Sequence, residues 1–311
     1  MTTTTPDLNK KTKSEGRSLA QDATRRFFRH PTGLLGLGIV GFFIIASLLA
    51  PVLAPYDASR DRNLRLRLTP PSWSLPQAER DRLGLTMWSL PFGADQQGRD
   101  LFVRVWHGGR ISLRVGLIAV AFASVTGVLL GLLAGYSGGW IDTLVVWLVD
   151  ILLAFPGILL AIAIVAILGP NLTNALIAIA ITQIPIYVRI TRSVVLSLRE
   201  SEYVQAAQAL GSRGPRVVFS HIFPNSLSPI IVQLTLSVGV AILDVAALGF
   251  LGLGAQPPAP EWGAMIKAGY DKFLQAPYMS IFPGIAIFLS VVGFNLLGDA
   301  VRDVLDPRLK S

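Results

Sequence analysis

Apolar residues gather in long segments of this chain, and polar residues fill the stretches between them. A helix needs about 20 apolar residues to cross the roughly 30 Å hydrocarbon layer of a membrane. The segments reach that length, so the pattern predicts six membrane-spanning helices. We place them within Pro31–Tyr56 and Val115–Ile141, and at about Trp140–Leu168, Leu172–Ser193, Pro229–Leu253 and Ile281–Gly298.

The third and fourth segments share one run without a charged residue, Ile151–Val188. At about 1.5 Å per residue, a continuous helix of that length would be nearly twice as long as a bilayer is thick. Gly169-Pro170-Asn171 lies inside the run and is a turn signal. We therefore expect two helices that separate at this turn.

The composition supports an integral membrane protein. Hydrophobic residues make up 52% of the 311 residues and charged residues 15%, against about 25% charged residues in typical soluble domains. The formal charge is +8, but no recognisable nucleic-acid motif gathers the 27 Lys and Arg residues, so the expected partner is the lipid bilayer and not nucleic acid. The absence of cysteine excludes thiolate chemistry, and His30, His107 and His221 lack metal-ligand spacing, so no metal site is expected.

Basic residues assign an orientation to the predicted helices. Seven Lys and Arg residues precede Pro31, and Arg192, Arg199, Arg213 and Arg216 follow or end the fourth segment. Six crossings place both stretches and the C-terminus on one side, which the positive-inside rule assigns to the cytoplasm. The loop 57–110 argues against this with nine arginines, but its length approaches the regime of about 60 residues in which the rule weakens.

The predicted organisation is a cytoplasmic segment 1–30, a first transmembrane helix 31–56, an extracytoplasmic loop 57–110, a five-helix core 111–300 with a cytoplasmic loop 194–228, and a cytoplasmic tail 301–311.

The cytoplasmic loop 194–228 carries signals of two short helices. Ser201 can cap a helix that starts at Glu202, and Gly211 suits a left-handed stop at its end. A second short helix is expected to open at Pro215 and to end by Pro224. The first helix carries small and apolar side chains that another protein could contact, at Tyr203, Val204, Ala206, Ala207, Ala209 and Leu210. The alternative is an ordinary loop that lies on the chain's own helices.

Several motifs in one order resemble a known family. They are Pro91–Asp100 with Arg104 and Gly109–Leu113, then Asp150–Pro156, then Glu202–Gly211 with Ile222-Phe223-Pro224, then Phe250–Gly254 with Pro257-Pro258 and Trp262-Gly263, and last Asn295–Asp299 with Asp306-Pro307-Arg308. From about residue 25 to its end, the chain resembles the shorter, C-type permease subunit of the dipeptide, oligopeptide and nickel class of binding-protein-dependent ABC importers. The resemblance implies an all-α, polytopic membrane protein with six transmembrane helices and the type I ABC importer permease fold.

The resemblance also implies partners and a site. The loop 194–228 would be the coupling loop that docks a separate ATPase, in a bacterial cytoplasmic (inner) membrane with both termini cytoplasmic. The partners would be a second homologous permease, two ATP-binding subunits and an extracytoplasmic solute-binding protein. The residues carried over for ATPase coupling are Glu202, Tyr203, Gln205, Ala206, Ala207, Ala209, Leu210, Gly211, Ile222 and Pro224. The chain has no Gly-x-x-x-x-Gly-Lys-Ser/Thr loop, so we expect no catalytic or cofactor residue here, with ATP and Mg bound by the ATPase subunits.

The chain departs from the family pattern at two places in this loop. Gln205 stands where the motif has Glu, and Phe223 stands where Leu is usual before Pro224. A salt bridge from a glutamate at position 205 is therefore not available to this chain. Glu202, one turn earlier, could serve instead.

Asp150 and Asp244 lie deep inside predicted membrane helices. Each costs several kcal/mol in hydrocarbon unless it is paired or faces water, so lipid exposure is not expected. The alternatives are a contact with a solute amine in the translocation path, or packing and pairing within or between subunits. Arg189, near the cytoplasmic end of the fourth helix, is expected to reach toward the interface.

The transported solute stays open at this stage. The family resemblance favours di- or oligopeptides, with nickel chelates or oligosaccharides as alternatives for the same machinery. A rival class is an ion-coupled secondary transporter, which would need paired acidic sites and broken midplane helices. A further rival is a sensory or scaffold membrane protein without transport.

Overall fold

The computed structural model describes residues 24–57 and 60–305, and this part of the chain is helical with no named strand. Five helices are long and apolar enough to cross a membrane. They are α2 (Pro31–Leu53), α4 (Leu101–Ser137), α7 (Leu172–Arg199), α10 (Phe223–Phe250) and α12 (Tyr278–Leu305). A bent pair, α5 (Gly139–Leu153) and α6 (Gly157–Leu168), brings the possible spans to six. The predicted all-α polytopic fold is confirmed.

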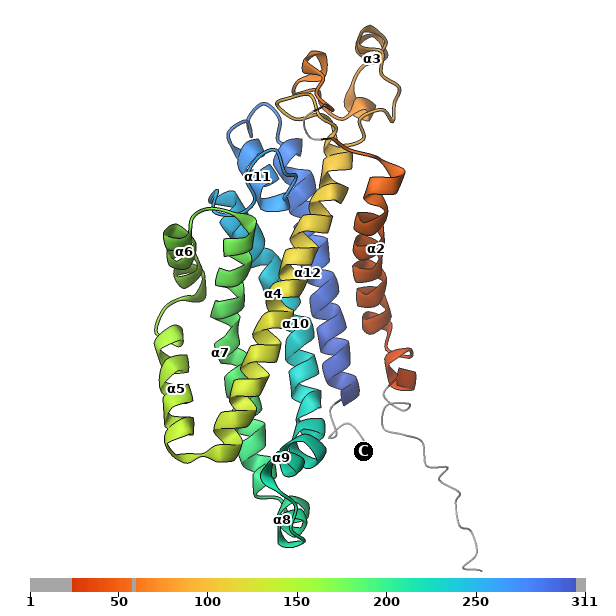
Figure 1. The fold of residues 1–311 in the computed structure, drawn as a ribbon. Helices are drawn as coiled ribbons and strands as arrows, with labels where there is room; N and C mark the ends of the chain where they lie inside the picture. The colour runs from red at the N-terminus through yellow and green to blue at the C-terminus, as the bar shows by residue number, and fades with distance from the viewer. Residues whose placement is uncertain (1–23, 58–59, 306–311) are drawn as a thin grey trace, which may run out of the picture.

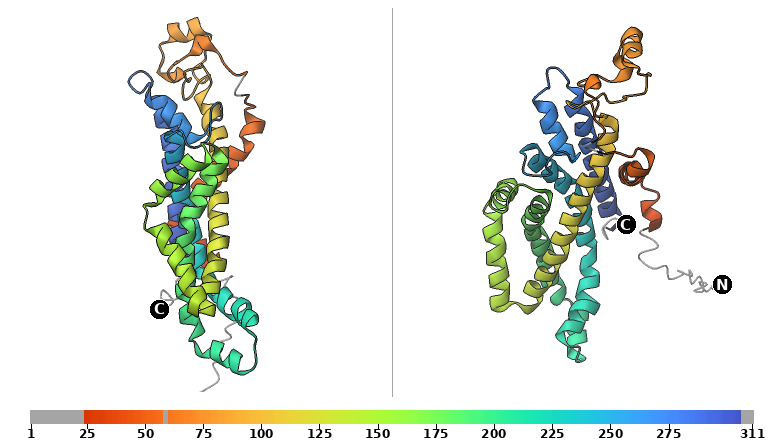
Figure 2. Two further views of the ribbon diagram at one scale, coloured as in Figure 1. Left: turned by 60° about the vertical axis from the view of Figure 1, so that its left-hand side comes forward. Right: turned by 45° about the horizontal axis from the view of Figure 1, so that its top comes forward.

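Short elements occupy the two ends of the bundle (Figure 1). One end carries η1 (Leu64–Leu66), η2 (Ser72–Ser74), α3 (Gln77–Leu83) and α11 (Trp262–Tyr270). The opposite end carries α8 (Glu202–Ala209), α9 (Gly214–Val217) and the π-helical η3 (Val218–Ile222). The start of α2 and the end of α12 lie toward α8, as Figure 2 also shows. The tail residues 1–23 and 306–311, with the Asp306-Pro307-Arg308 motif, are outside the described residues.

Small residues bring α4 against α7 along most of their length. Gly127, Gly131 and Gly135 follow one another at four-residue spacing on α4 and face α7. A Cβ atom at Gly131 would lie 2.7 Å from the Thr191 Cβ, closer than side-chain carbons approach. Small residues at this spacing allow close backbone packing of membrane helices, where van der Waals contact replaces the hydrophobic driving force. The α4–α7 pair is therefore the centre of the bundle.

The third predicted helix is not continuous. We expected one helix over about Trp140–Leu168, and the structure instead has α5 and α6 at an angle of 89°. The break coincides with Pro156, which has no N–H to donate and disfavours a helical residue before it. The turn predicted at Gly169-Pro170-Asn171 is present, because α6 ends at Leu168 and α7 begins at Leu172.

Several other helices are longer than the apolar pattern indicated, among them α4 and α10. α4 begins at Leu101, ahead of the boundary at residue 110, because the Asp100 carboxylate caps its first turn by accepting from the Phe102 N–H at 2.8 Å. α10 begins at Phe223, ahead of the expected Pro229, which lies inside the helix. A charge-free apolar run shows which part of a helix lies in the membrane. The ends of the helix depend instead on how its terminal N–H and carbonyl groups are hydrogen-bonded.

Candidate coupling and translocation sites

The short helix α8 ends as the sequence predicts. Gly211 has a φ of +85°, in the left-handed region that favours glycine. The Gly211 N–H donates to the Gln208 carbonyl at 2.9 Å, and the Ser212 N–H donates to the Ala207 carbonyl at 3.0 Å. This pair of bonds is the Schellman arrangement, which satisfies the last carbonyls of a helix. It directs the chain sharply from α8 toward α9.

One apolar side chain fixes α8 on the bundle. Val204 is fully buried, and it shares a cluster with Val195 of α7, Val217 of α9 and Ile222 of η3. The predicted coupling residues that remain exposed are Glu202, Tyr203, Gln205, Ala206, Ala209, Leu210, Gly211 and Pro224. Ala207 is half-buried, and Ile222 is buried beneath α8 and supports it.

The exposed face of α8 has the character of a protein-binding surface. The Leu210 side chain is 88% exposed and Tyr203 is 44% exposed, at the end of the molecule farthest from α3. Large apolar side chains held out on a short, well-terminated helix are costly in water unless a partner covers them. The small Ala206 and Ala209 side chains between them leave room for a partner's backbone.

Two details at the start of α8 differ from expectation. Ser201 occupies the N-cap position, but its hydroxyl donates to the Leu198 carbonyl and does not cap the helix. The Gln205 amide donates to the Glu200 carbonyl at 3.1 Å, a bond that a glutamate could not donate. Gln205 therefore ties the first turn of α8 to the end of α7.

The second predicted short helix does not end at Pro224. α9, η3 and α10 form one helical stretch, Gly214–Phe250, so the predicted coupling loop 194–228 runs directly into a membrane helix. Pro224 lies in the first turn of α10, directly after the wider π-helical turn of η3. Proline has no N–H to donate, so it lacks one helical hydrogen bond at this junction. A displacement of α8 and α9 would therefore reach α10 without an intervening flexible linker.

Ion pairs join α5 to α7 at two levels. Arg192 donates two hydrogen bonds to the Asp142 carboxylate, of which the bond from Nη2 is 2.6 Å long. Arg189 Nη2 lies 2.8 Å from Asp150 Oδ1, and these side chains are 59% and 54% exposed. Arg189 was expected to reach toward the membrane interface, and the structure pairs it with Asp150 instead. The pairing satisfies both charges, while their exposure leaves them open to a partner chain or to water.

The helix break lies one turn beyond Asp150. The hydrogen bonds of α5 end where the Ala154 N–H donates to the Asp150 and Ile151 carbonyls, and those of α6 begin where the Leu160 N–H donates to the Pro156 carbonyl. Irregular backbone at membrane depth is tolerated where protein buries it or water reaches it. Phe155, in the break, is 57% exposed in the single chain.

Asp244 has a different environment. It is half-buried on α10 beside Gln183 of α7, inside the subunit. The amide nitrogen and oxygen of Gln183 are buried and have no hydrogen-bond partner among the described residues. The structure thus places Asp150 on an open face and Asp244 at a helix contact within the subunit.

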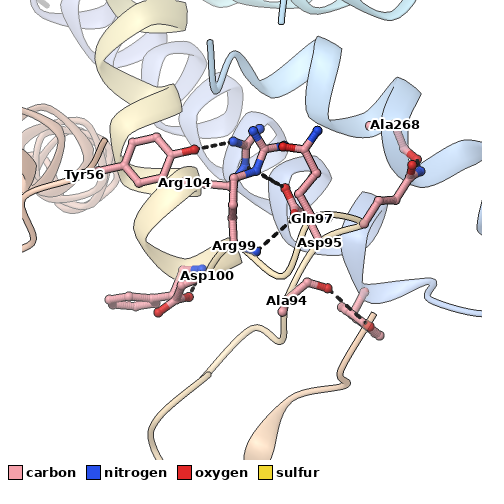
Figure 3. Close-up of polar contacts among 11 residues, drawn as sticks. Tyr56, Ala94, Asp95, Gln97, Arg99, Asp100, Arg104 and Ala268 are labelled. Atoms are coloured by element: carbon pink, nitrogen blue, oxygen red, sulfur yellow. Dashed lines mark hydrogen bonds and ion pairs between the residues drawn. The ribbon is translucent and has the colours of Figure 1, made fainter. Parts of the chain in front are cut away.

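A polar cluster at the end of the bundle that carries α3 was not predicted from the sequence, although its residues include a motif noted there (Figure 3). Asp95 accepts hydrogen bonds from the Gln97 N–H at 2.7 Å and from Arg99 Nε at 2.6 Å, and Arg104 Nε lies 3.5 Å from the same carboxylate. Arg104 also donates to the Tyr56 hydroxyl. The cluster fastens the loop 57–100 to α4 and to the end of α2. The contact between Arg104 and Tyr56 spans 48 positions, and no local pattern in the sequence signals it.

A buried glutamate holds α11 in place. Glu261 is fully buried and accepts from the Gly263 and Ala264 N–H groups, each at 2.8 Å, and from Ser112 Oγ of α4 at 3.1 Å. Burial raises the pKa of Glu261, and these hydrogen bonds partly oppose the shift. The sequence signal for this helix cap is an acidic residue directly before the Trp262-Gly263 motif.

Comparison with known proteins identifies the family. Residues 127–311 match the family described as binding-protein-dependent transport system inner membrane component, and residues 18–71 match the N-terminal transmembrane domain of oligopeptide transport permease C. The chain is 50% identical over 291 residues to the dipeptide transport system permease protein DppC of Alkalihalophilus pseudofirmus, covering 94% of this chain and 90% of that protein.

Two further relatives are also permease proteins of transport systems. The chain is 47% identical over 285 residues to the di/tripeptide transport system permease protein DppC of Pseudomonas aeruginosa, covering 91% of each chain. It is 42% identical over 288 residues to the glutathione transport system permease protein GsiD of Pectobacterium atrosepticum, covering 92% of this chain and 90% of that one.

The fold and the matches define a multi-pass membrane permease of the type I ABC importer fold. The chain belongs to the family of inner-membrane components of binding-protein-dependent transport systems. It is a transport permease and not an enzyme, and the family implies an ATPase partner and a solute-binding partner. The resemblance inferred from the motifs is confirmed, and this membership replaces the two rival classes.

Proposed function

We propose that this chain forms half of the translocation path of an ATP-driven importer of di- or oligopeptides, beside a second homologous permease. The peptide class is supported by the dipeptide, di/tripeptide and glutathione permeases among its relatives. Two ATP-binding subunits would supply the energy and bind ATP and Mg, and an extracytoplasmic solute-binding protein would deliver the peptide.

The observation that carries the proposal is the exposed, well-terminated helix α8. It presents Tyr203, Ala206 and Leu210 away from the bundle, while Val204 fixes it to α7 and η3. Because α9, η3 and α10 are continuous, an ATPase that moves α8 would move a membrane helix with it. ATP-driven closure of the ATPase subunits would then open the path alternately to the two sides.

We place the Asp150–Arg189 pair on this path. The support is the exposure of both charged groups and the broken backbone beside them, neither of which suits a lipid-facing surface. Asp244 stays a weaker candidate, because it faces Gln183 inside the subunit.

We place the protein in the bacterial cytoplasmic (inner) membrane, with both termini and α8 in the cytoplasm. The basic residues of the loop 194–228 support this orientation. The chain has no cysteine, so single cysteines at Ser74 and Ser212 can be labelled without interference. An impermeant thiol reagent should reach them from opposite faces, and labelling of both from one face would overturn the orientation.

The coupling role is tested with Gly211→Val and Ala207→Asp. A Cβ at a residue with φ of +85° costs about 1 kcal/mol or more and would redirect α9, and a carboxylate at Ala207 would hold a partner away from the helix. Both variants should reach the membrane at wild-type levels yet lose uptake and either ATPase association or transport-linked hydrolysis.

Matched controls lie at the opposite end of the molecule. Gly84 ends α3 with a φ of +69° and open space around its Cβ position, so Gly84→Val introduces the same backbone strain. Ala78→Asp adds the same charge to exposed α3. Both controls should retain ATPase association. Normal uptake by Gly211→Val and Ala207→Asp at equal membrane levels would refute the coupling role.

A further inference from the structure

Two arginines on α4 have no partner among the described residues. Arg110 and Arg114 lie one helical turn apart, both are exposed, and neither takes part in a hydrogen bond or an ion pair there. The other arginine on α4, Arg104, is paired with Asp95 and Tyr56. Two uncompensated guanidinium groups on a membrane helix are costly, so a negatively charged group is expected beside them.

The two arginines stand between two grooves. One groove, of about 440 Å³, lies between α4 and Ile44, Ser47 and Leu48 of α2. The other, of about 400 Å³, lies between α4 and Leu172, Thr173 and Leu176 of α7. Both arginines line both grooves.

The grooves lie in the half of the bundle that carries α3 and α11, which is the extracytoplasmic half in the proposed orientation. α2 ends at Leu53, a short distance beyond Leu48, and Leu172 opens α7 at the same end of the bundle. At about 1.5 Å per residue, Leu48 is roughly 8 Å below the end of α2. This depth corresponds to the boundary between lipid headgroups and hydrocarbon.

An apolar stripe continues from the arginines toward the membrane centre. Ile118, Phe122, Val125 and Leu129 follow on the exposed side of α4, with exposed fractions from 43% to 61%. From Ile118 to Leu129 the stripe is roughly 16 Å long, which is about half of the hydrocarbon thickness and therefore one leaflet. A positive pair above an apolar stripe of this length matches a phospholipid, with its phosphate above and its acyl chain below.

We propose that Arg110 and Arg114 bind the phosphate of an anionic phospholipid from the extracytoplasmic leaflet, with its chains in the two grooves. A peptide path is a poorer match, because besides the arginines the grooves offer only Ser47 and Thr173 as polar groups. The guanidinium fork suits phosphate oxygens, and charge-assisted contacts of this kind are the strong ones. The site is independent of the coupling role of α8.

The test is a lipid titration of the purified full-length chain by native mass spectrometry. The probes are palmitoyl-oleoyl phosphatidylglycerol, dioleoylglycerol without a phosphate, and inorganic phosphate without chains. Arg110→Gln with Arg114→Gln should weaken phosphatidylglycerol binding at least about tenfold, since two charge-assisted bonds are lost. Arg216→Gln, an exposed arginine on α9 at the other end, is the matched control and should bind as the wild type does.

A second variant separates charge loss from misfolding. Arg110→Lys with Arg114→Lys keeps both charges and should retain most of the binding. Equal phosphatidylglycerol binding by the wild type and the double Gln variant would overturn the site, as would equal binding of dioleoylglycerol. Displacement of the lipid by inorganic phosphate at equal concentration would assign a free-anion site instead.

The same titration with the assembled transporter distinguishes a lipid from a protein partner. A lipid site predicts that the wild-type complex binds more phosphatidylglycerol than the complex with both Gln substitutions. If the two complexes bind it equally while the isolated chains differ, a second permease covers the arginines and the proposal is wrong.

Discussion

Arg189 Nη2 lies 2.8 Å from Asp150 Oδ1, and each of these side chains is more than half exposed in the single chain. The pair bridges α7 and α5 one turn before the break between α5 and α6. Charged residues within a membrane helix almost always face the bundle interior, a partner or water. We therefore expect that lipid does not cover the face of α5 that carries this pair.

The first prediction concerns this pair. Asp150→Asn or Arg189→Gln leaves one charge without its partner, and we expect uptake at equal membrane levels to fall at least about fivefold, equivalent to about 1 kcal/mol. The swapped double variant Asp150→Arg with Arg189→Asp restores the attraction and should recover part of the loss. Glu79→Gln, on exposed α3, is the control. A swapped variant no better than the worse single variant would show that attraction between the two charges is not what matters.

The second prediction concerns pH. Burial raises the pKa of Asp100, the N-cap of α4, from 3.8 to about 6. Between about pH 4 and 6 the Asp100 carboxyl is protonated in the folded state and ionised in the unfolded state. The free energy of unfolding therefore falls as the pH rises through this window and levels off above it. Asp100→Asn keeps the cap, because Asn and Asp cap equally well. Its melting temperature in detergent should lose this part of the pH dependence, and an unchanged slope would contradict the assignment.

The third prediction tests the packing of α4 on α7. In Gly131→Ala the new Cβ would lie 2.7 Å from the Thr191 Cβ and 2.8 Å from the Val188 carbonyl oxygen, so the two backbones must separate. We expect a loss of about 1–3 kcal/mol, measured as a lower melting temperature. Gly41→Ala on α2 meets nothing within 4 Å and should have little effect. Equal melting temperatures for the two variants would remove the argument for close α4–α7 contact.

The sequence predicted the helical membrane fold and the position of α8 because both depend on local signals. Apolar runs of bilayer length define the spans, and Gly211 defines a left-handed stop whatever surrounds it. The break of the third span was not predicted, because the apolar run continues across Pro156 without a charged residue. A helix kink at proline is local too, so that signal was available.

Other features could not be predicted because they depend on tertiary contacts. The continuity of α9, η3 and α10 across Pro224 needs a π-helical turn that packing selects. In the cluster around Asp95, Arg99 is only four positions away, but Arg104 also contacts Tyr56, which lies 48 positions earlier. The partner of Asp150 is 39 positions away, on another helix. A charged residue type shows that a partner is needed, but the identity of the partner depends on the folded structure.

The central claim is that the exposed face of α8 contacts a separate ATPase, and crosslinking from a single cysteine tests it most directly. The chain has no cysteine of its own, so Ala206→Cys can carry a benzophenone probe on α8, with Ala78→Cys on α3 as the matched control. After illumination of the assembled transporter, we predict a covalent product that joins this chain to the ATPase subunit from position 206 and none from position 78. No such product from position 206 in a transporter that still imports its solute would contradict the account.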